Sequence, residues 1–260
     1  MSRRISRITC SIVSVVIVAA SASSCVANDG SILIIGILAP PTSSGTGATA
    51  VCTYTADIMG PFLSFGTVDF AFTRQYIPEL LLGNQLVPQA NGSIDRLETD
   101  NINIEGAIVT VTDEGTGEQL DNYTVLGAGF LQPSSGGEPG IGTYATTMVS
   151  PKVADALGVF TGTKRLISNV EVYGTTSGGT YLKSAQIPFE INACFGCLVV
   201  FSTAADDPAS PIQPNCDAST TSGSTTITPP CVFGQDQAID CQLCAGTGAP
   251  YSPTVNVCEP

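Results

Sequence analysis

Histidine is absent from this chain of 260 residues. Because histidine is the commonest general base and the commonest metal ligand near neutral pH, its absence removes both roles together. Serine and threonine are abundant, but a serine nucleophile would need a lysine as its base, and no Ser-x-x-Lys pattern occurs. The sequence therefore predicts no enzyme and no catalytic residue. An extracytoplasmic hydrolase that uses a carboxylate pair is the alternative, because such pairs carry no short sequence signature.

Charged side chains are scarce and mostly acidic. They make up 12% of the chain, against about 25% in a typical soluble domain, so the surface must be polar chiefly through Ser, Thr, Asn and Gln. The chain has 9 Lys and Arg and 22 Asp and Glu, which gives a formal net charge of −13. Such a chain repels phosphate backbones, and we expect no nucleic-acid partner. A protein or glycan ligand is compatible with this charge.

The apolar run from Ile12 to Ala20 is too short to span a membrane as a helix. It follows a basic end with Arg3, Arg4 and Arg7, and small residues come after it. A basic segment, an apolar segment and a small-residue exit are the pattern of a secretory signal peptide. We expect residues 1–24 to be such a signal and the mature protein to be exported.

The end of this signal, Ala22-Ser23-Ser24-Cys25, looks like a bacterial lipobox, although that motif usually has Leu where Ala22 stands. It predicts a lipid on Cys25 and a membrane as partner through this anchor. Val26 after the cysteine favours the outer membrane or the cell surface. Ordinary signal-peptidase cleavage after Ala22 is the alternative.

Cysteine arithmetic favours the lipid anchor. Of the 10 cysteines, Cys10 leaves with the signal and a lipidated Cys25 cannot pair, so an even set remains for an oxidised protein. Cleavage after Ala22 would leave an unpaired one. The pairing of the remaining candidates cannot be deduced from spacing. The disulfide candidates are Cys52, Cys194, Cys197, Cys216, Cys231, Cys241, Cys244 and Cys258.

Short segments in which apolar and polar residues alternate predict strands, and turn residues separate them. A bulge is expected at Gly106, a turn at Gly83-Asn84, and one short helix at 153–157. A glycine-rich loop should join the last two strand segments into a hairpin. The expected strand segments are Cys52–Ala56, Val68–Phe72, Ile102–Thr112, Tyr123–Phe130, Thr143–Val149, Leu166–Tyr173 and Tyr181–Ile191.

This pattern predicts an all-β fold, an immunoglobulin-like two-sheet sandwich over residues 51–203, with a closed barrel as the alternative. Residues 25–50 are expected as a leader and linker, although Ile32 to Leu38 is also compatible with a buried strand. Residues 204–260 are rich in Pro, Ser, Thr and Cys. We expect them to form a disulfide-rich, mostly irregular tail on or after the sandwich, because they are too poor in apolar periodicity to bury a core.

Two Cys-x-x-Cys pairs, Cys194–Cys197 and Cys241–Cys244, have the spacing of a structural zinc site. Export favours disulfides instead, so no metal and no cofactor are expected. Thiolate metal binding stays as a third hypothesis. A thioredoxin-like redox role is disfavoured, because Cys194 follows a strand and does not begin a helix.

Acidic residues gather between Asp95 and Asn103, and smaller groups occur at Asp113-Glu114 and Asp206-Asp207. Oxygen ligands in a loop can bind calcium, but no EF-hand spacing is present. Solvated charges at turns are the favoured interpretation.

Three features resemble the uncharacterised, cysteine-rich lipoproteins of myxobacteria: the lipobox-like ending at Cys25, the stretch Tyr76–Val87 with Leu80-Leu81-Leu82-Gly83-Asn84 at its centre, and the strand Phe189–Cys197 that ends in Cys-x-x-Cys. The resemblance implies an envelope or cell-surface location and supplies no catalytic residue. Together with the residue patterns, it leads us to expect a non-enzymatic surface protein that acts as a structural or binding module.

Overall fold

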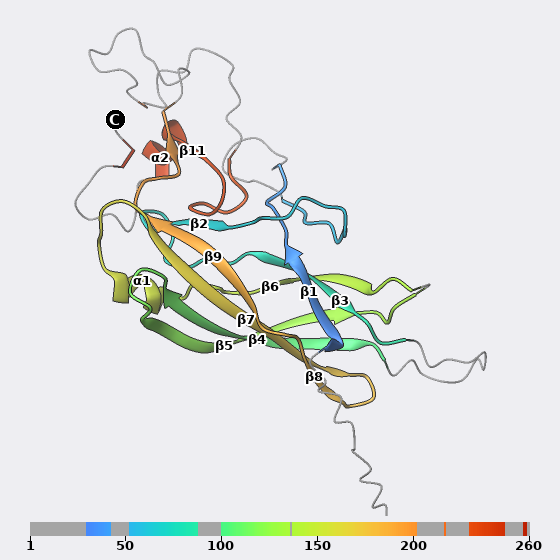
Figure 1. Cartoon of the computed structure of the whole chain (residues 1–260). Coiled ribbons are helices and arrows are strands. Elements are labelled where there is room, and N and C mark those ends of the chain that lie inside the picture. Colours follow the sequence, from blue (N-terminus) through green and yellow to red (C-terminus); the bar gives the residue numbers. More distant parts are fainter. Residues whose placement is uncertain are drawn as a thin grey trace, which may run out of the picture.

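The computed structural model describes residues 30–42, 52–87, 100–135, 137–201, 216, 229–247 and 257–258. Within them the chain consists mostly of strands, which confirms the β-rich prediction (Figure 1). The expected signal peptide and Cys25 lie outside the described residues. Neither helix in the described part of the chain is long and apolar enough to cross a membrane.

The larger sheet has six strands and curls into a half-barrel (Figure 1). Its neighbouring strands are antiparallel, except that β2 and β9 run parallel at one edge. The hairpin predicted at the glycine-rich loop is present, and a second hairpin turns at the acidic residues Asp113-Glu114. In order, the strands are β2 (Gly66–Asp69), β9 (Ile187–Cys194), β7 (Lys164–Thr176), β4 (Ile102–Asp113) and β5 (Gln119–Leu131), with β8 (Tyr181–Lys183) paired to β7.

A second sheet has the order β1 (Ile32–Ile37), β3 (Glu79–Asn84) and β6 (Gly140–Ala145), all antiparallel. The pairing of β1 brings part of the 25–50 segment into the fold, as its buried-strand interpretation predicts. The turn predicted at Gly83-Asn84 is wrong. Both residues lie in β3, because the strand continues with partners on each side.

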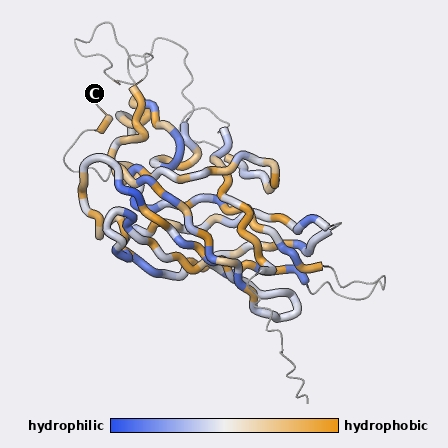
Figure 2. The backbone as a smooth tube through the Cα atoms, viewed as in Figure 1, coloured by the Kyte–Doolittle hydropathy of each residue, from blue (hydrophilic) through white to orange (hydrophobic). Residues whose placement is uncertain are grey.

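One hydrophobic core joins the two sheets. Every second residue of β7 from Leu166 to Val172 is buried, as period-two alternation requires. Figure 2 shows hydrophobic and hydrophilic residues alternating along the long strands. Ser168 is polar but fully buried, and its hydroxyl donates to the backbone oxygen of Met148 at 2.9 Å. Apolar side chains therefore line the buried face of β7, and the buried hydroxyl of Ser168 has a hydrogen-bond partner.

The bulge predicted at Gly106 is confirmed, because the register of β4 shifts between Ile104 and Gly106 against both neighbouring strands. A Cβ at Gly106 would lie 2.3 Å from the backbone oxygen of Val125 and 2.5 Å from the Tyr173 hydroxyl oxygen. Only glycine allows this approach, and the bulge is a local bend of the kind that curls a sheet.

The short helix predicted at 153–157 is α1 (Pro151–Leu157). The strand predicted at Cys52–Ala56 is wrong. This segment is irregular in the structure, and Cys52 is held instead by a disulfide to Cys231. The predicted strand Val68–Phe72 is shorter than expected, since β2 ends at Asp69 and the chain turns there.

The described part of the C-terminal segment contains β11 (Ile239–Asp240), paired in parallel with β10 (Val199–Val200), and α2 (Cys241–Thr247). The sequence patterns do not predict α2. Their only hint is the spacing of Cys241 and Cys244, which puts both on one side of a helix.

Four disulfides are present: Cys52–Cys231, Cys194–Cys197, Cys216–Cys241 and Cys244–Cys258. The prediction of disulfide bonds is confirmed, and this number of them indicates an extracytoplasmic protein. Their sequence separations are 179, 3, 25 and 14. On chain entropy alone, the longest loop restricts the unfolded chain by about 5 kcal/mol and the shortest by about 2 kcal/mol. The first disulfide is therefore the main covalent tie between the C-terminal segment and the sheets.

Gly106→Ala is expected to lower the free energy of unfolding by about 1–3 kcal/mol, because the new methyl group overlaps a backbone oxygen that cannot move without breaking the ladder. Denaturant titration measures this change. Gly30→Ala is the matched control, since nothing lies within 4 Å of a Cβ built there. Equal effects of the two substitutions would contradict the bulge as the cause.

Candidate functional site

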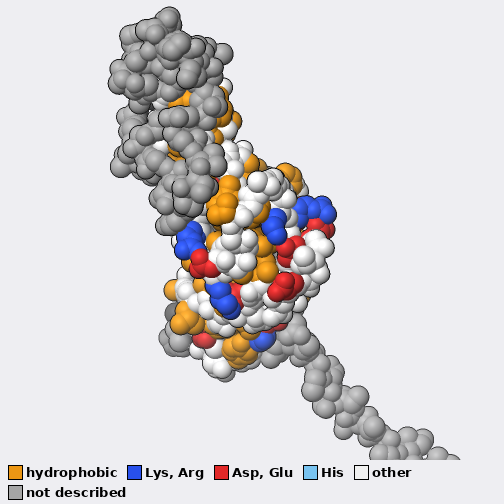
Figure 3. Space-filling model, turned by 90° about the vertical axis from the view of Figure 1, so that its left-hand side faces the viewer, with side chains coloured by type: hydrophobic (Ala, Val, Ile, Leu, Met, Phe, Trp, Pro, Cys, Tyr) orange, Lys and Arg blue, Asp and Glu red, His pale blue; other side chains and the backbone are white. Residues whose placement is uncertain are grey.

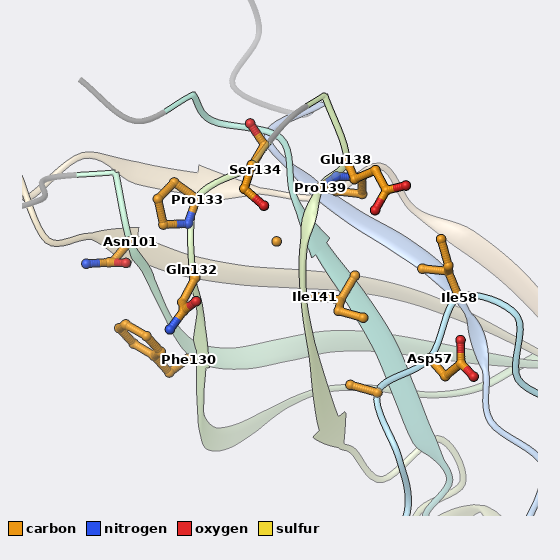
Figure 4. Close-up of a pocket in the computed structure, with 13 residues that line it drawn as sticks. Asp57, Ile58, Asn101, Phe130, Gln132, Pro133, Ser134, Glu138, Pro139 and Ile141 are labelled. Carbon is orange, nitrogen blue, oxygen red and sulfur yellow. The ribbon is translucent and has the colours of Figure 1, made fainter. Parts of the chain in front are cut away.

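A pocket of about 700 Å³ lies at the connection between β5 and β6. It is closed on one side by the end of β5, the start of β6 and the loop between them, and on the other by the segment Ala56–Ile58. Figure 4 shows Phe130, Gln132 and Asn101 on one side of the opening, with Ile141, Ile58 and the two carboxylates Asp57 and Glu138 on the other. Segments far apart in the sequence thus form one recess.

The loop that forms the pocket is held by backbone hydrogen bonds. The N–H of Ser134 donates to the oxygen of Leu86 at 2.8 Å, and Ser135 and Glu138 bond reciprocally at 3.0 and 3.1 Å. A Cβ at Gly140 would lie 2.0 Å from the backbone oxygen of Gln132, so the start of β6 passes the end of β5 at a distance that only glycine permits. The loop is therefore set in place by the backbone before any ligand binds.

The buried side chain of Asn84 bonds to the backbone segments that lead into the pocket. Its amide nitrogen donates to the backbone oxygens of Asp100 at 2.8 Å and Leu131 at 3.4 Å, and its amide oxygen accepts the N–H of Leu86 at 2.9 Å. These bonds fix the residues next to Asn101 and Gln132. The polar wall of the pocket therefore rests on a satisfied buried amide.

The pocket lining combines exposed apolar surface with uncharged polar groups. Phe130 is 53% exposed and Ile58 is 41% exposed, values that leave a ring and an aliphatic side chain open to a ligand. Amides and hydroxyls complete the lining, and its charged members are both acidic. An aromatic face beside convergent hydrogen-bonding groups is the usual make-up of a small-ligand site. The polar members are Asn101, Gln132, Ser134, Ser135, Asp57 and Glu138.

The two carboxylates of the pocket lack burial. Both are exposed, and Oδ1 of Asp57 accepts the N–H of Met59 at 2.8 Å in a local turn. A glycosidase acid needs burial to hold its proton near neutral pH. These carboxylates are better placed to accept hydrogen bonds from a ligand.

The basic residues of the described part of the chain are all engaged in ion pairs. On the face shown in Figure 3, basic and acidic side chains lie close to one another among uncharged ones. Since acidic residues outnumber these paired cations, the described surface offers little to an anionic ligand. The pairs are Arg74–Asp155, Lys152–Asp121, Lys164–Asp113, Arg165–Glu114, Arg165–Glu190 and Lys183–Glu171.

The Cys194–Cys197 disulfide lies against a buried carboxylate, Asp69. Oδ1 of Asp69 accepts the N–H of Gly196 at 2.7 Å, and Oδ2 accepts the N–H of Leu198 at 3.1 Å. A carboxylate oxygen of Asp69 and both sulfurs lie within 4.8 Å of one another. Burial raises the pKa of Asp69, although these bonds and one from the Ala71 N–H act to lower it.

A second carboxylate, that of the partly buried Asp236, joins the C-terminal segment to the core. Oδ1 accepts the N–H of Thr67 at 2.7 Å, and Oδ2 accepts the Tyr76 hydroxyl at 2.9 Å. Burial raises the pKa of Asp236 to about 6, against the lowering effect of both hydrogen bonds. The same burial and the Asp236 charge raise the pKa of Tyr76.

The candidate residues from the sequence have different places in the described structure. The structure does not bring the two Cys-x-x-Cys pairs together as a metal site, because all four cysteines are in disulfides. Asp113 caps its turn through the Gly115 N–H at 2.8 Å, in line with a turn charge. The calcium candidates Asp95 and Glu98, and the pair Asp206-Asp207, lie outside the described residues.

Sequence patterns missed Asp69, Asp236 and the pocket residue Phe130. Apart from Ala71, the side-chain partners of the two aspartates lie more than a hundred positions away in the chain, so little local signal marks them. Phe130 is exposed, as are Leu126, Gly127 and Ala128 of the same strand, so nothing in the pattern of β5 marks it as a pocket residue.

No family model matches the sequence, and no curated protein matches it either. Among solved structures, the chain is similar to a structural genomics target, SoR45, with a TM-score of 0.31 and 10% identity over 65% of this chain and 91% of that one. It is also similar to a protein assigned to the late embryogenesis abundant class, with a TM-score of 0.28 and 12% identity over 50% of this chain and 71% of that one. Neither similarity is strong enough to identify a fold family.

Asp236→Asn is expected to change the pH dependence of stability. An acid whose pKa is raised on folding, here from 3.8 to about 6, contributes stability that is complete below the unfolded value and is lost as the pH rises through the folded value. The wild-type protein should therefore lose about 2–3 kcal/mol between pH 4 and 7 relative to the Asn variant, in which this site does not titrate.

Denaturant titrations of both proteins at pH 4, 5, 6 and 7 measure the difference between their free energies of unfolding. Contributions of Asp69 and Asp121 cancel in this difference, because both proteins contain these residues. Glu118→Gln, at an exposed carboxylate, is the control. If the free energy of unfolding of the wild type minus that of the variant stays constant with pH, the raised pKa of Asp236 is contradicted.

Proposed function

We propose that the protein is a non-enzymatic, extracytoplasmic binding module and that the pocket between β5 and β6 takes a neutral, hydroxylated ligand of the glycan class. The observation that carries this proposal is the recess of about 700 Å³, in which the exposed ring of Phe130 stands beside amides, hydroxyls and carboxylates.

The chemistry of the lining favours a sugar over an anionic ligand. An aromatic ring packs against the C–H face of a sugar, while amides and carboxylates accept and donate the hydrogen bonds of its hydroxyls. The charged side chains of the lining are acidic, and they would repel a phosphate or a carboxylate. The well-held loop supports tight selection, because little order has to be gained on binding.

The localisation part of the proposal rests on the sequence. Residues 1–24 are the signal peptide, and Cys25 carries a lipid that anchors the protein in the outer membrane. β1 begins at Ile32, which pairs with Asn84 next to the pocket. An anchor at Cys25 would thus attach the fold at its pocket end, no more than about 25 Å of extended chain away. In this proposal, the two larger sheets form the immunoglobulin-like sandwich that carries the pocket.

Phe130→Ala is expected to weaken oligosaccharide binding about tenfold or more, since the loss of a stacked ring costs on the order of 1–2 kcal/mol. Isothermal titration of the purified protein with a panel of neutral and acidic oligosaccharides measures it. Gln132→Ala should weaken the same ligands by removing hydrogen bonds.

Leu126→Ala is the matched control, because Leu126 is an 82% exposed apolar residue of the same strand and does not line the pocket. Absence of binding across the panel, or an equal loss in the Leu126 variant, would contradict the proposal. Cleavage of an oligosaccharide that stops with Asp57→Asn or Glu138→Gln would establish the hydrolase alternative instead.

A further inference from the structure

The Cys194–Cys197 disulfide differs from the other three in what it can contribute to the fold. Its sequence separation of 3 closes the shortest loop, so it restricts the unfolded chain least. Cys194 is buried at the end of β9, whereas Cys197 is exposed. A disulfide with one exposed cysteine and a small structural contribution is suited to exchange with thiols in solution.

The loop around this disulfide is held by hydrogen bonds as well as by the S–S bond. Asp69 accepts N–H groups from Gly196 and Leu198, the residues on either side of Cys197. Gly196 has a φ of 77°, which glycine adopts without strain. These hydrogen bonds do not involve the sulfur atoms, so they can hold the two thiols close together after reduction.

We propose that Cys194–Cys197 is a thiol–disulfide exchange site, with Asp69 exchanging the proton of Cys194, and that it accepts two electrons from a partner dithiol. The group is assembled from the end of β2, the end of β9 and the loop that follows it. It is separate from the glycan pocket and does not depend on that proposal.

Exchange begins when a thiolate of the partner attacks Sγ of the exposed residue Cys197. A partner–Cys197 disulfide forms, the Cys194–Cys197 bond breaks, and its electron pair goes to Sγ of Cys194. The carboxyl group of Asp69 passes a proton from water to this sulfur. The second partner thiolate then attacks its own sulfur in the mixed disulfide, and Cys197 leaves as a thiolate that takes a proton from water. The partner dithiol is oxidised to a disulfide, and the protein gains two electrons and two protons.

The environment of Asp69 fits proton exchange. Burial raises its pKa, and the groups that act against burial are the three backbone N–H donors, with no ionised side chain among them. The ion pairs of the described residues do not include Asp69. In the reverse direction, the carboxylate of Asp69 takes the proton from the Cys194 thiol before the disulfide forms again.

The test reduces the full-length exported protein with dithiothreitol, traps thiols with iodoacetamide over time, and quantifies each cysteine by peptide mass. Cys194 and Cys197 should react at least about tenfold faster than Cys52 and Cys231, which are also partly accessible, while the circular dichroism stays unchanged. Asp69→Asn should slow exchange about tenfold and remove one step from its pH profile, since general acid–base help is lost.

Asp236→Asn is the control, because Asp236 is also a hydrogen-bonded carboxylate with a raised pKa but is only partly buried and bonds to Thr67 and Tyr76. It should leave the exchange rate and its pH profile unchanged. Reduction no faster than at Cys52–Cys231, or only together with loss of structure, would overturn the proposal, as would a pH profile that Asp69→Asn leaves intact. The comparison of disulfides in the wild-type protein decides the matter even where the Asn variant does not fold.

Discussion

The structure depends on how the outer edge of β2 is covered. Residues 234–236 lie along this edge: the N–H of Asp69 donates to the oxygen of Gly234 at 2.8 Å, and the N–H of Asp236 donates to the oxygen of Thr67 at 3.0 Å. An uncovered strand edge exposes unpaired backbone groups and invites aggregation. The C-terminal segment supplies the missing partners, so the sheet and the segment complete each other.

This attachment explains why a segment with little apolar periodicity belongs to the fold. Gln235 adds side-chain bonds to the backbone of Ile77 at 2.9 Å and Gln75 at 3.2 Å, and the Cys52–Cys231 disulfide fixes the start of the described stretch covalently. Polar contacts of this kind carry a desolvation cost, seen in the raised pKa of Asp236. The long covalent loop offsets that cost by restricting the unfolded chain. A small apolar cluster around Phe72 and Ile239 adds to the attachment of the C-terminal segment.

Local features of the fold could be predicted because local physics decides them. The alternation of β7 and β9 reflects half-buried strands, and the β4 bulge follows from a glycine inside a β-branched run. The partners of β1 and the parallel pairing of β2 with β9 are contacts between distant segments, for which periodicity carries no information. The pocket could not be predicted for the same reason, because Asp57, Phe130 and Asn101 are far apart in the sequence and come together only in the folded chain. The two buried aspartates look like ordinary turn residues until their distant partners are in place.

Disulfide mapping tests the central claim, that the C-terminal segment is held beside β2, because Cys52–Cys231 is the covalent link that joins this segment to the earlier part of the described chain. The purified protein is digested without reduction, after thiols have been blocked, and the linked peptides are identified by mass. The structure predicts that Cys52 is joined to Cys231 and that Cys194, Cys216 and Cys244 are joined to Cys197, Cys241 and Cys258, respectively. A free thiol at Cys52 or Cys231, or a link from Cys52 to any other cysteine, would contradict it.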